Sequence, residues 1–73
     1  MKLYLLTRIE SGGYDTYDAL IVAARSVKQA RTILPDPSNL STWIRPEQVV
    51  VEYIGEAKSG TKVGVVLASF QAG

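Results

Sequence analysis

The sequence contains neither cysteine nor histidine. These absences exclude disulfides, thiolate chemistry, zinc sites built from the usual ligands and any histidine acting as a general base. No apolar stretch approaches the length needed to span a membrane. Residues 1–10 lack the long hydrophobic region and small-residue cleavage site of a signal peptide, so we expect a strand there. We therefore expect a cytoplasmic protein without a membrane partner.

The sequence also has little net charge, +1 at pH 7. A protein that binds DNA or RNA usually carries a basic stripe, so a nucleic acid polymer is not an expected partner. Hydrophobic residues make up 47% of the chain and charged residues 21%, which is typical of a globular protein and argues against disorder. A chain of 73 residues forms one domain, here residues 1–73.

Four β-branched or apolar segments predict strands, and one segment between the second and third predicts a helix. The strand segments are residues 3–8, 19–24, 49–54 and 63–70. Gly60 lies in the polar turn between the last two segments and is free to take a positive φ. The order β-β-α-β-β favours an α+β fold with a four-stranded, mainly antiparallel sheet and one helix on one face. The sequence leaves the strand order open.

The helix is expected to begin after Ser26, which is suited to an N-cap, and to run to about Leu34. Pro35 ends it, because the residue before a proline avoids the helical region. Its apolar face comprises Val27, Ala30, Ile33 and Leu34. One short helix cannot cover both faces of the sheet, although the strands carry apolar residues on both. An exposed apolar patch usually marks an interface, so we expect a homo-oligomer, a dimer or higher, joined through sheet faces or edges.

No motif for catalysis is present: the chain has no P-loop, no GxGxxG and no nucleophile elbow. Asp15 and Asp18 are the only closely spaced carboxylates, and a solvated turn explains them better than an acid pair. A nucleophile such as Ser69 would need a base. We therefore expect a protein that is not an enzyme and uses no cofactor or metal. The open alternative is a nuclease or nucleotide hydrolase that holds a metal with the two aspartates.

A ligand-binding role is easier to build from aromatic, basic and polar side chains. The candidate ligand-binding residues are Tyr14, Asp15, Tyr17, Arg25, Arg31, Trp43, Ser69 and Gln71. In this hypothesis the tyrosines or Trp43 stack on a base, and the two arginines hold phosphates. Two structural alternatives stay open. The arginines could be solvated or paired with the aspartates, and Trp43 could close one end of the core.

Several stretches together resemble a family of very short proteins that are common in phages and prophages. They are MKLYLLTR, a Gly-Tyr-Asp-x-Tyr-Asp loop, a Val/Ala-rich strand, an Ala-Arg helix, a loop tryptophan, VVVEYIGEA, a Gly-x-x-x-Gly turn and ASFQAG. The resemblance spans almost the whole chain. The chain departs from the family by having few residues between the helix and Trp43, and by lacking a histidine there.

Small phage proteins of this build include anti-defence sponges, which are oligomers that bind cyclic nucleotides or cyclic ADP-ribose signals without cleaving them. The resemblance therefore implies a non-catalytic protein in the cytoplasm of an infected host cell. Its partner would be a small-molecule nucleotide signal, held in a pocket between protomers. The alternative is a small protein-interaction module that inhibits a host protein, for instance by adding an edge strand to it.

Overall fold

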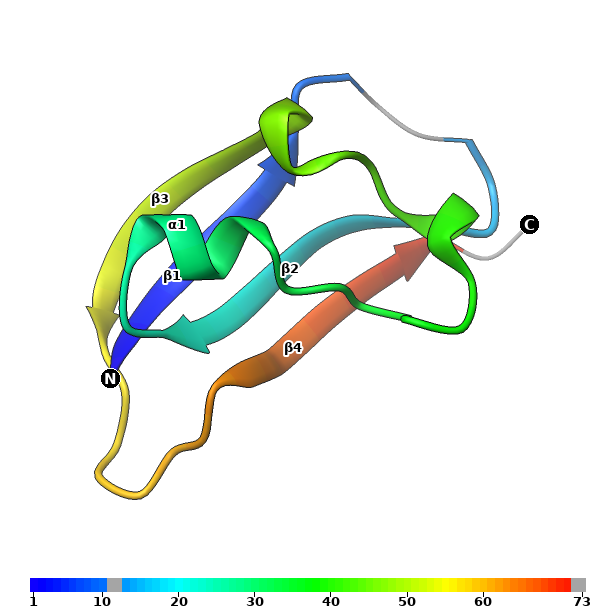
Figure 1. The fold of residues 1–73 in the computed structure, drawn as a ribbon. Coiled ribbons are helices and arrows are strands. Elements are labelled where there is room, and N and C mark those ends of the chain that lie inside the picture. Colours follow the sequence, from blue (N-terminus) through cyan, green and yellow to red (C-terminus); the bar gives the residue numbers. More distant parts are fainter. Residues whose placement is uncertain (11–12, 72–73) are drawn as a thin grey trace.

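A computed structural model describes residues 1–10 and 13–71 as a four-stranded antiparallel sheet with one short helix (Figure 1). The strands are β1 (Lys2–Arg8), β2 (Thr16–Ala24), β3 (Val49–Glu56) and β4 (Gly64–Gln71). The helices are α1 (Val27–Arg31) and two 3-10 turns, η1 (Leu40–Thr42) and η2 (Pro46–Gln48). This arrangement confirms the predicted α+β fold. Ser11 and Gly12, between the first two strands, lie outside the described residues.

The sheet is built around the antiparallel pair of β1 and β2, in which Lys2 pairs with Ala24 and Thr7 with Ala19. The strand order is β3-β1-β2-β4, so the two central strands of the sheet, β1 and β2, are the first two strands in the sequence. Side chains along β1 alternate between the two faces of the sheet. Tyr4 and Leu6 are buried on one side, and the alternate residues lie on the other side.

One face of the sheet is covered by α1 and by the irregular segment 32–48, which crosses in front of the strands (Figure 1). The core lies between this covering layer and the sheet. It comprises Tyr4, Leu6, Leu20, Val22, Ala24, Ala30, Trp43 and Val49. We call the opposite side of the sheet the open face, because no described element packs on it; Leu5, Ile21 and Leu67 share it through their pairing.

The helix is shorter than the sequence predicts, and its expected end near Leu34 is wrong. The Ser26 side chain accepts the Gln29 N–H as the predicted N-cap, but α1 ends at Arg31. Thr32 tightens the last turn, because both its N–H and its hydroxyl donate to the Gln29 carbonyl. Within the expected apolar face, Ala30 is buried and Ile33 packs on the core, whereas Val27 and Leu34 are exposed.

The two valine-rich strands β3 and β4 follow each other in sequence but lie at opposite edges of the sheet. The turn between them passes below the ends of the central strands (Figure 1). Gly60 takes a φ of +90° there, as predicted from its place in the polar turn, and the Ala57 N–H donates to the Met1 carbonyl at 2.9 Å. β3 is supported by β1 and α1, whereas β4 pairs only with β2.

No helix within the described ranges 1–10 and 13–71 is long and apolar enough to cross a membrane.

Candidate functional site

The structure brings five of the eight predicted ligand-binding residues to one end of β2 and β4. They are Tyr14, Asp15, Tyr17, Ser69 and Gln71. We call this group the tyrosine end. The Asp15 N–H donates to the Gln71 carbonyl at 2.5 Å, and Thr16 pairs with Gln71 across the two strands. Two segments more than fifty residues apart in sequence therefore meet here.

The two tyrosines of this end are presented differently. Tyr14 is 71% exposed, and its ring is available to stack on a planar ligand. Tyr17 is half-buried and packs edge-on against Phe70, with 4.9 Å between ring centroids. Ser69 donates from its hydroxyl to an Asp18 carboxylate oxygen at 3.5 Å. The end thus offers one free aromatic face beside several hydrogen-bonding groups.

Arg25 lies at the far end of β2, where Ala23 pairs with Gly64. A strand rises about 3.3 Å per residue, so the nine residues of β2 separate Arg25 from the tyrosine end by roughly 25 Å. Within one chain, Arg25 and Tyr14 therefore cannot contact the same small ligand. Binding by these residues stays a prediction, because the expected pocket lies between protomers.

Arg31 is held by the fold. Its guanidinium donates to the carbonyls of Val49 and Pro46, the second at 3.3 Å, and so ties α1 to η2 and the start of β3. Hydrogen bonds from a charged donor contribute about 1.5–3 kcal/mol each to stability. Replacing Arg31 would therefore disturb this junction, and a loss of binding in such a variant would not identify a ligand contact.

Trp43 is only 7% exposed and belongs to the core. Its ring lies under the Arg8 guanidinium, with 5.9 Å from the guanidinium carbon to the ring centroid. Arg8 also donates to the Tyr17 carbonyl at 3.2 Å, which makes it the cation bonded to the tyrosine end. Arg8 was not among the predicted ligand-binding residues. Its place in the alternation of β1, on the same side as Tyr4 and Leu6, is the signal that could have found it.

Where Arg8 contacts Trp43, one N–H group of each side chain lacks a hydrogen-bond acceptor among the described residues. Arg8 Nε and Trp43 Nε1 are both buried and have no hydrogen-bond partner among the described residues. The cation over the indole ring compensates part of that cost through the ring's electrostatic attraction. The pair closes one end of the core next to Tyr17.

No group of three or more acidic side chains within residues 1–10 and 13–71 could hold a metal ion. The Tyr53 hydroxyl donates to Glu56 at 2.6 Å, and this bond raises the pKa of Tyr53 because it holds the phenolic proton. Since the ordinary value is already near 10, Tyr53 stays protonated at neutral pH.

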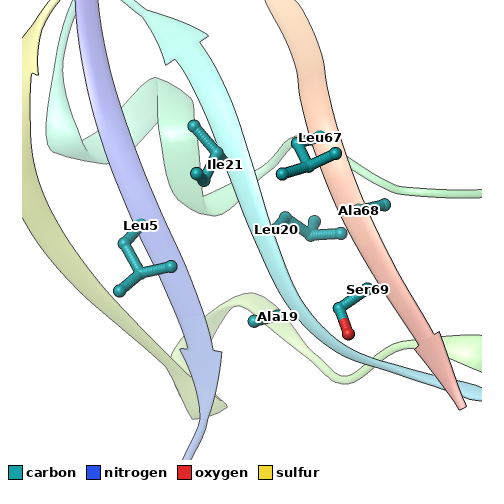
Figure 2. Close-up of a pocket in the computed structure, with 7 residues that line it drawn as sticks. All are labelled: Leu5, Ala19, Leu20, Ile21, Leu67, Ala68 and Ser69. Atoms are coloured by element: carbon teal, nitrogen blue, oxygen red, sulfur yellow. The ribbon is translucent and has the colours of Figure 1, made fainter.

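The open face carries a shallow hollow of about 300 Å³ between β1, β2 and β4 (Figure 2). It is lined by Leu5, Ala19, Leu20, Ile21, Leu67, Ala68 and Ser69. Ser69 supplies the only polar side chain of this lining and also belongs to the tyrosine end. The hollow can accept an apolar side chain, and it contains no charge that would hold a phosphate.

The chain matches no known family, curated protein or solved structure. The resemblance to small phage proteins therefore stays a prediction, and function must be inferred from geometry. Two features are available for that inference: the tyrosine end and the exposed apolar surface of β4.

Proposed function

We propose that this protein is a non-catalytic protein-interaction module that binds another protein chain through β4 and the adjoining open face. The supporting observation is the exposure of β4, in which every residue from 65 to 71 is exposed. Its exposed apolar side chains are Val65 at 40%, Val66 at 54%, Leu67 at 63% and Phe70 at 46%. Side chains on both faces of one edge strand are therefore open to a partner.

The sequence of β4 also supports this role. Natural proteins protect exposed edge strands with charged residues, proline, short length, a β-bulge or a covering segment, and of these β4 has a bulge at Val66. From residue 63 to residue 71 the chain has neither charge nor proline, and β4 is eight residues long. An edge of this kind exposes unpaired N–H and C=O groups in a row, and an added strand can satisfy them. A bound protein chain would also remove the apolar side chains from water, which stabilises the complex.

A charge placed in the middle of β4 should prevent this contact. We expect Leu67→Lys to remove both self-association in sedimentation experiments and retention of any protein partner in affinity capture. A lysine cannot be buried beside a second strand without losing its hydration. Because the Leu67 side chain is 63% exposed, the fold of the single chain should be kept, with an unchanged circular dichroism spectrum.

Ile9→Lys is the matched control, because Ile9 is 60% exposed and lies outside β4. It adds the same charge at a similarly exposed apolar position and should behave as the unmodified chain. If Leu67→Lys associated as well as Ile9→Lys in both experiments, the proposed function would be wrong.

A second candidate function is binding of a nucleotide signal such as a cyclic nucleotide or cyclic ADP-ribose, without cleavage. The gathering of five predicted residues at the tyrosine end favours it. Tyr14 offers a stacking face, and Ser69 and Gln71 offer hydrogen bonds to a base. The end contains one bonded cation, Arg8, so a site for phosphates would need further positive groups from a second copy.

Native mass spectrometry tests this candidate directly, with a panel of cyclic dinucleotides, cyclic trinucleotides and cyclic ADP-ribose isomers. We expect an intact ligand to add to an oligomer and to be released on denaturation. Stacking of a base on an aromatic ring contributes about 1–3 kcal/mol to the binding free energy. Tyr14→Ala should therefore weaken binding roughly 5- to 150-fold. Tyr53→Ala is the control, because Tyr53 is an exposed tyrosine on the other edge strand, β3, and this variant should bind the ligand as the unmodified chain does. An oligomer that binds no member of the panel would contradict this candidate.

A further inference from the structure

We propose that the partner of β4 is β4 of a second copy, paired antiparallel about a two-fold axis near Leu67. Two sheets would then join into one sheet of eight strands. This inference rests on the proposed function and names the partner. It is carried by the exposed edge of β4, by the charges at its two ends and by the place of Leu67.

The occupant of this surface must be a strand. A small ligand or an apolar surface could cover one face of β4, but neither would satisfy the backbone groups along its outer edge. β4 is an edge strand of the sheet, and no described strand lies beyond it. An added strand satisfies that edge, and its side chains extend both faces at once.

The charges at the ends of β4 favour a second copy in the antiparallel direction. Lys62 precedes β4, and Arg25 follows β2 at the same end of the sheet. Asp15 and Asp18 lie at the opposite end, beside Gln71 and Ser69. A two-fold axis across β4 brings the basic end of each copy to the acidic end of the other. A parallel pair would instead place equal charges next to each other at both ends.

The strand itself, which carries no charge between these ends, presents nothing that repels an identical strand. The axis must pass beside one residue that faces its own copy, because a two-fold axis normal to an antiparallel pair exchanges opposite residues. Leu67 is the most exposed apolar residue of β4 and lies near the middle of Gly64–Gln71. Ser69 pairs with Ala19 on the open face, as Leu67 does with Ile21, whereas Val65 pairs with Val22 on the covered face.

Leu67 also lines the hollow of the open face. The pairing sets the two Leu67 side chains against each other on that face, with a hollow on either side. The register with β2 shifts between Ile21 and Val22, so that Val66 is an extra residue on β4. A second shift, between Tyr17 and Ala19, leaves Asp18 as an extra residue on β2. The two-fold axis places one Val66 bulge on each side of itself, so the contact between the two β4 strands centres on the Leu67 pair.

The same pairing would supply what the tyrosine end lacks. The partner's Lys62 and Arg25 end lies next to Tyr14 and Gln71 in an antiparallel pair. Positive groups from one copy and an aromatic face from the other would then border one site at each end of the joined strands. A ligand with phosphates would contact both copies.

Single cysteines give a clear test, because the chain has none of its own. Leu67→Cys and Ser69→Cys, which share the open face, are each oxidised gently, and the covalent dimer is measured by mass spectrometry. A disulfide needs Cα atoms about 4.4–6.8 Å apart, which directly opposite residues of an antiparallel pair satisfy. Ser69 is displaced by two residues from the axis, so its two copies lie roughly 13 Å apart along the strands.

We therefore expect Leu67→Cys to form a covalent dimer at least 10-fold faster than Ser69→Cys. Similar rates of self-dimerisation at the two positions would indicate a parallel pair and overturn the proposal. So would a chain that sediments as a monomer of 7.9 kDa.

The result also separates this inference from the function on which it rests. Suppose the chain is monomeric but retains another protein, and Leu67→Lys abolishes that retention while Ile9→Lys does not. The proposal that the partner is a second copy is then wrong, but the proposed interaction surface stands. If Leu67→Lys changes neither association nor retention, both are wrong.

Discussion

Leu6→Ala is expected to lower the free energy of unfolding by about 2–5 kcal/mol. Leu6 is 0% exposed in the middle of β1, between the sheet's two neighbouring strands and the covering layer. Truncation removes apolar contacts and leaves a cavity that a small sheet cannot close. A domain of 73 residues is stable by roughly 4–11 kcal/mol at 0.05–0.15 kcal/mol per residue. The variant should therefore be partly unfolded at moderate temperature.

The measurement is urea unfolding followed by circular dichroism at one fixed chain concentration, because self-association would add to the apparent stability. Leu40→Ala is the control, since Leu40 is 65% exposed and the same truncation there should change stability by no more than about 0.5 kcal/mol. Equal losses in the two variants would contradict the core described above.

Trp43→Ala should lower stability by a comparable amount, about 3–5 kcal/mol. Trp43 is only 7% exposed, and the Arg8 guanidinium lies over its indole ring. Its removal empties one end of the core and takes away the ring that faces the guanidinium. The same unfolding experiment measures this loss, and intrinsic fluorescence offers a second probe in the unmodified chain because Trp43 is its one tryptophan.

Trp43→Phe separates the two roles that the sequence allows for this residue. A phenylalanine keeps most of the buried apolar volume and a face for Arg8, so stability should fall by less than in the alanine variant. If Trp43 closes the core, ligand or partner binding by the folded phenylalanine variant should be unchanged. A folded Trp43→Phe variant with strongly reduced binding would place the indole in a site.

The sequence predicts the elements well because their signals are local. Alternation in residues 3–8 separates the two faces of β1, and Ser26 identifies the start of α1. The predicted helix end is wrong because both the N–H and the hydroxyl of Thr32 donate to the Gln29 carbonyl, which ends α1 before Leu34. Pro35 sets only an outer limit for the helix.

The candidate site is harder to predict because it depends on strand order. Nothing in residues 49–70 says that β3 and β4 lie at opposite edges, since either edge of the central pair can accept a strand. That order places Ser69 and Gln71 beside Tyr14, whereas the length of β2 separates Arg25 from them. Arg31 and Trp43 were chosen for their chemistry, whereas their contacts with Val49, Pro46 and Arg8 depend on tertiary packing.

The passage of the chain from one edge of the sheet to the other has a consequence for the rate of folding. β1 and β2 can meet early through a short connection, but β3 must close a long loop to pair Lys2 with Glu56. Proteins dominated by such non-local pairing fold in milliseconds to seconds. Until β4 crosses back, the edge of β2 stays available to β4 of another copy. At high concentration the turn at residues 57–63 could then act as a hinge for exchanging β4 between chains, giving a swapped dimer that separates slowly.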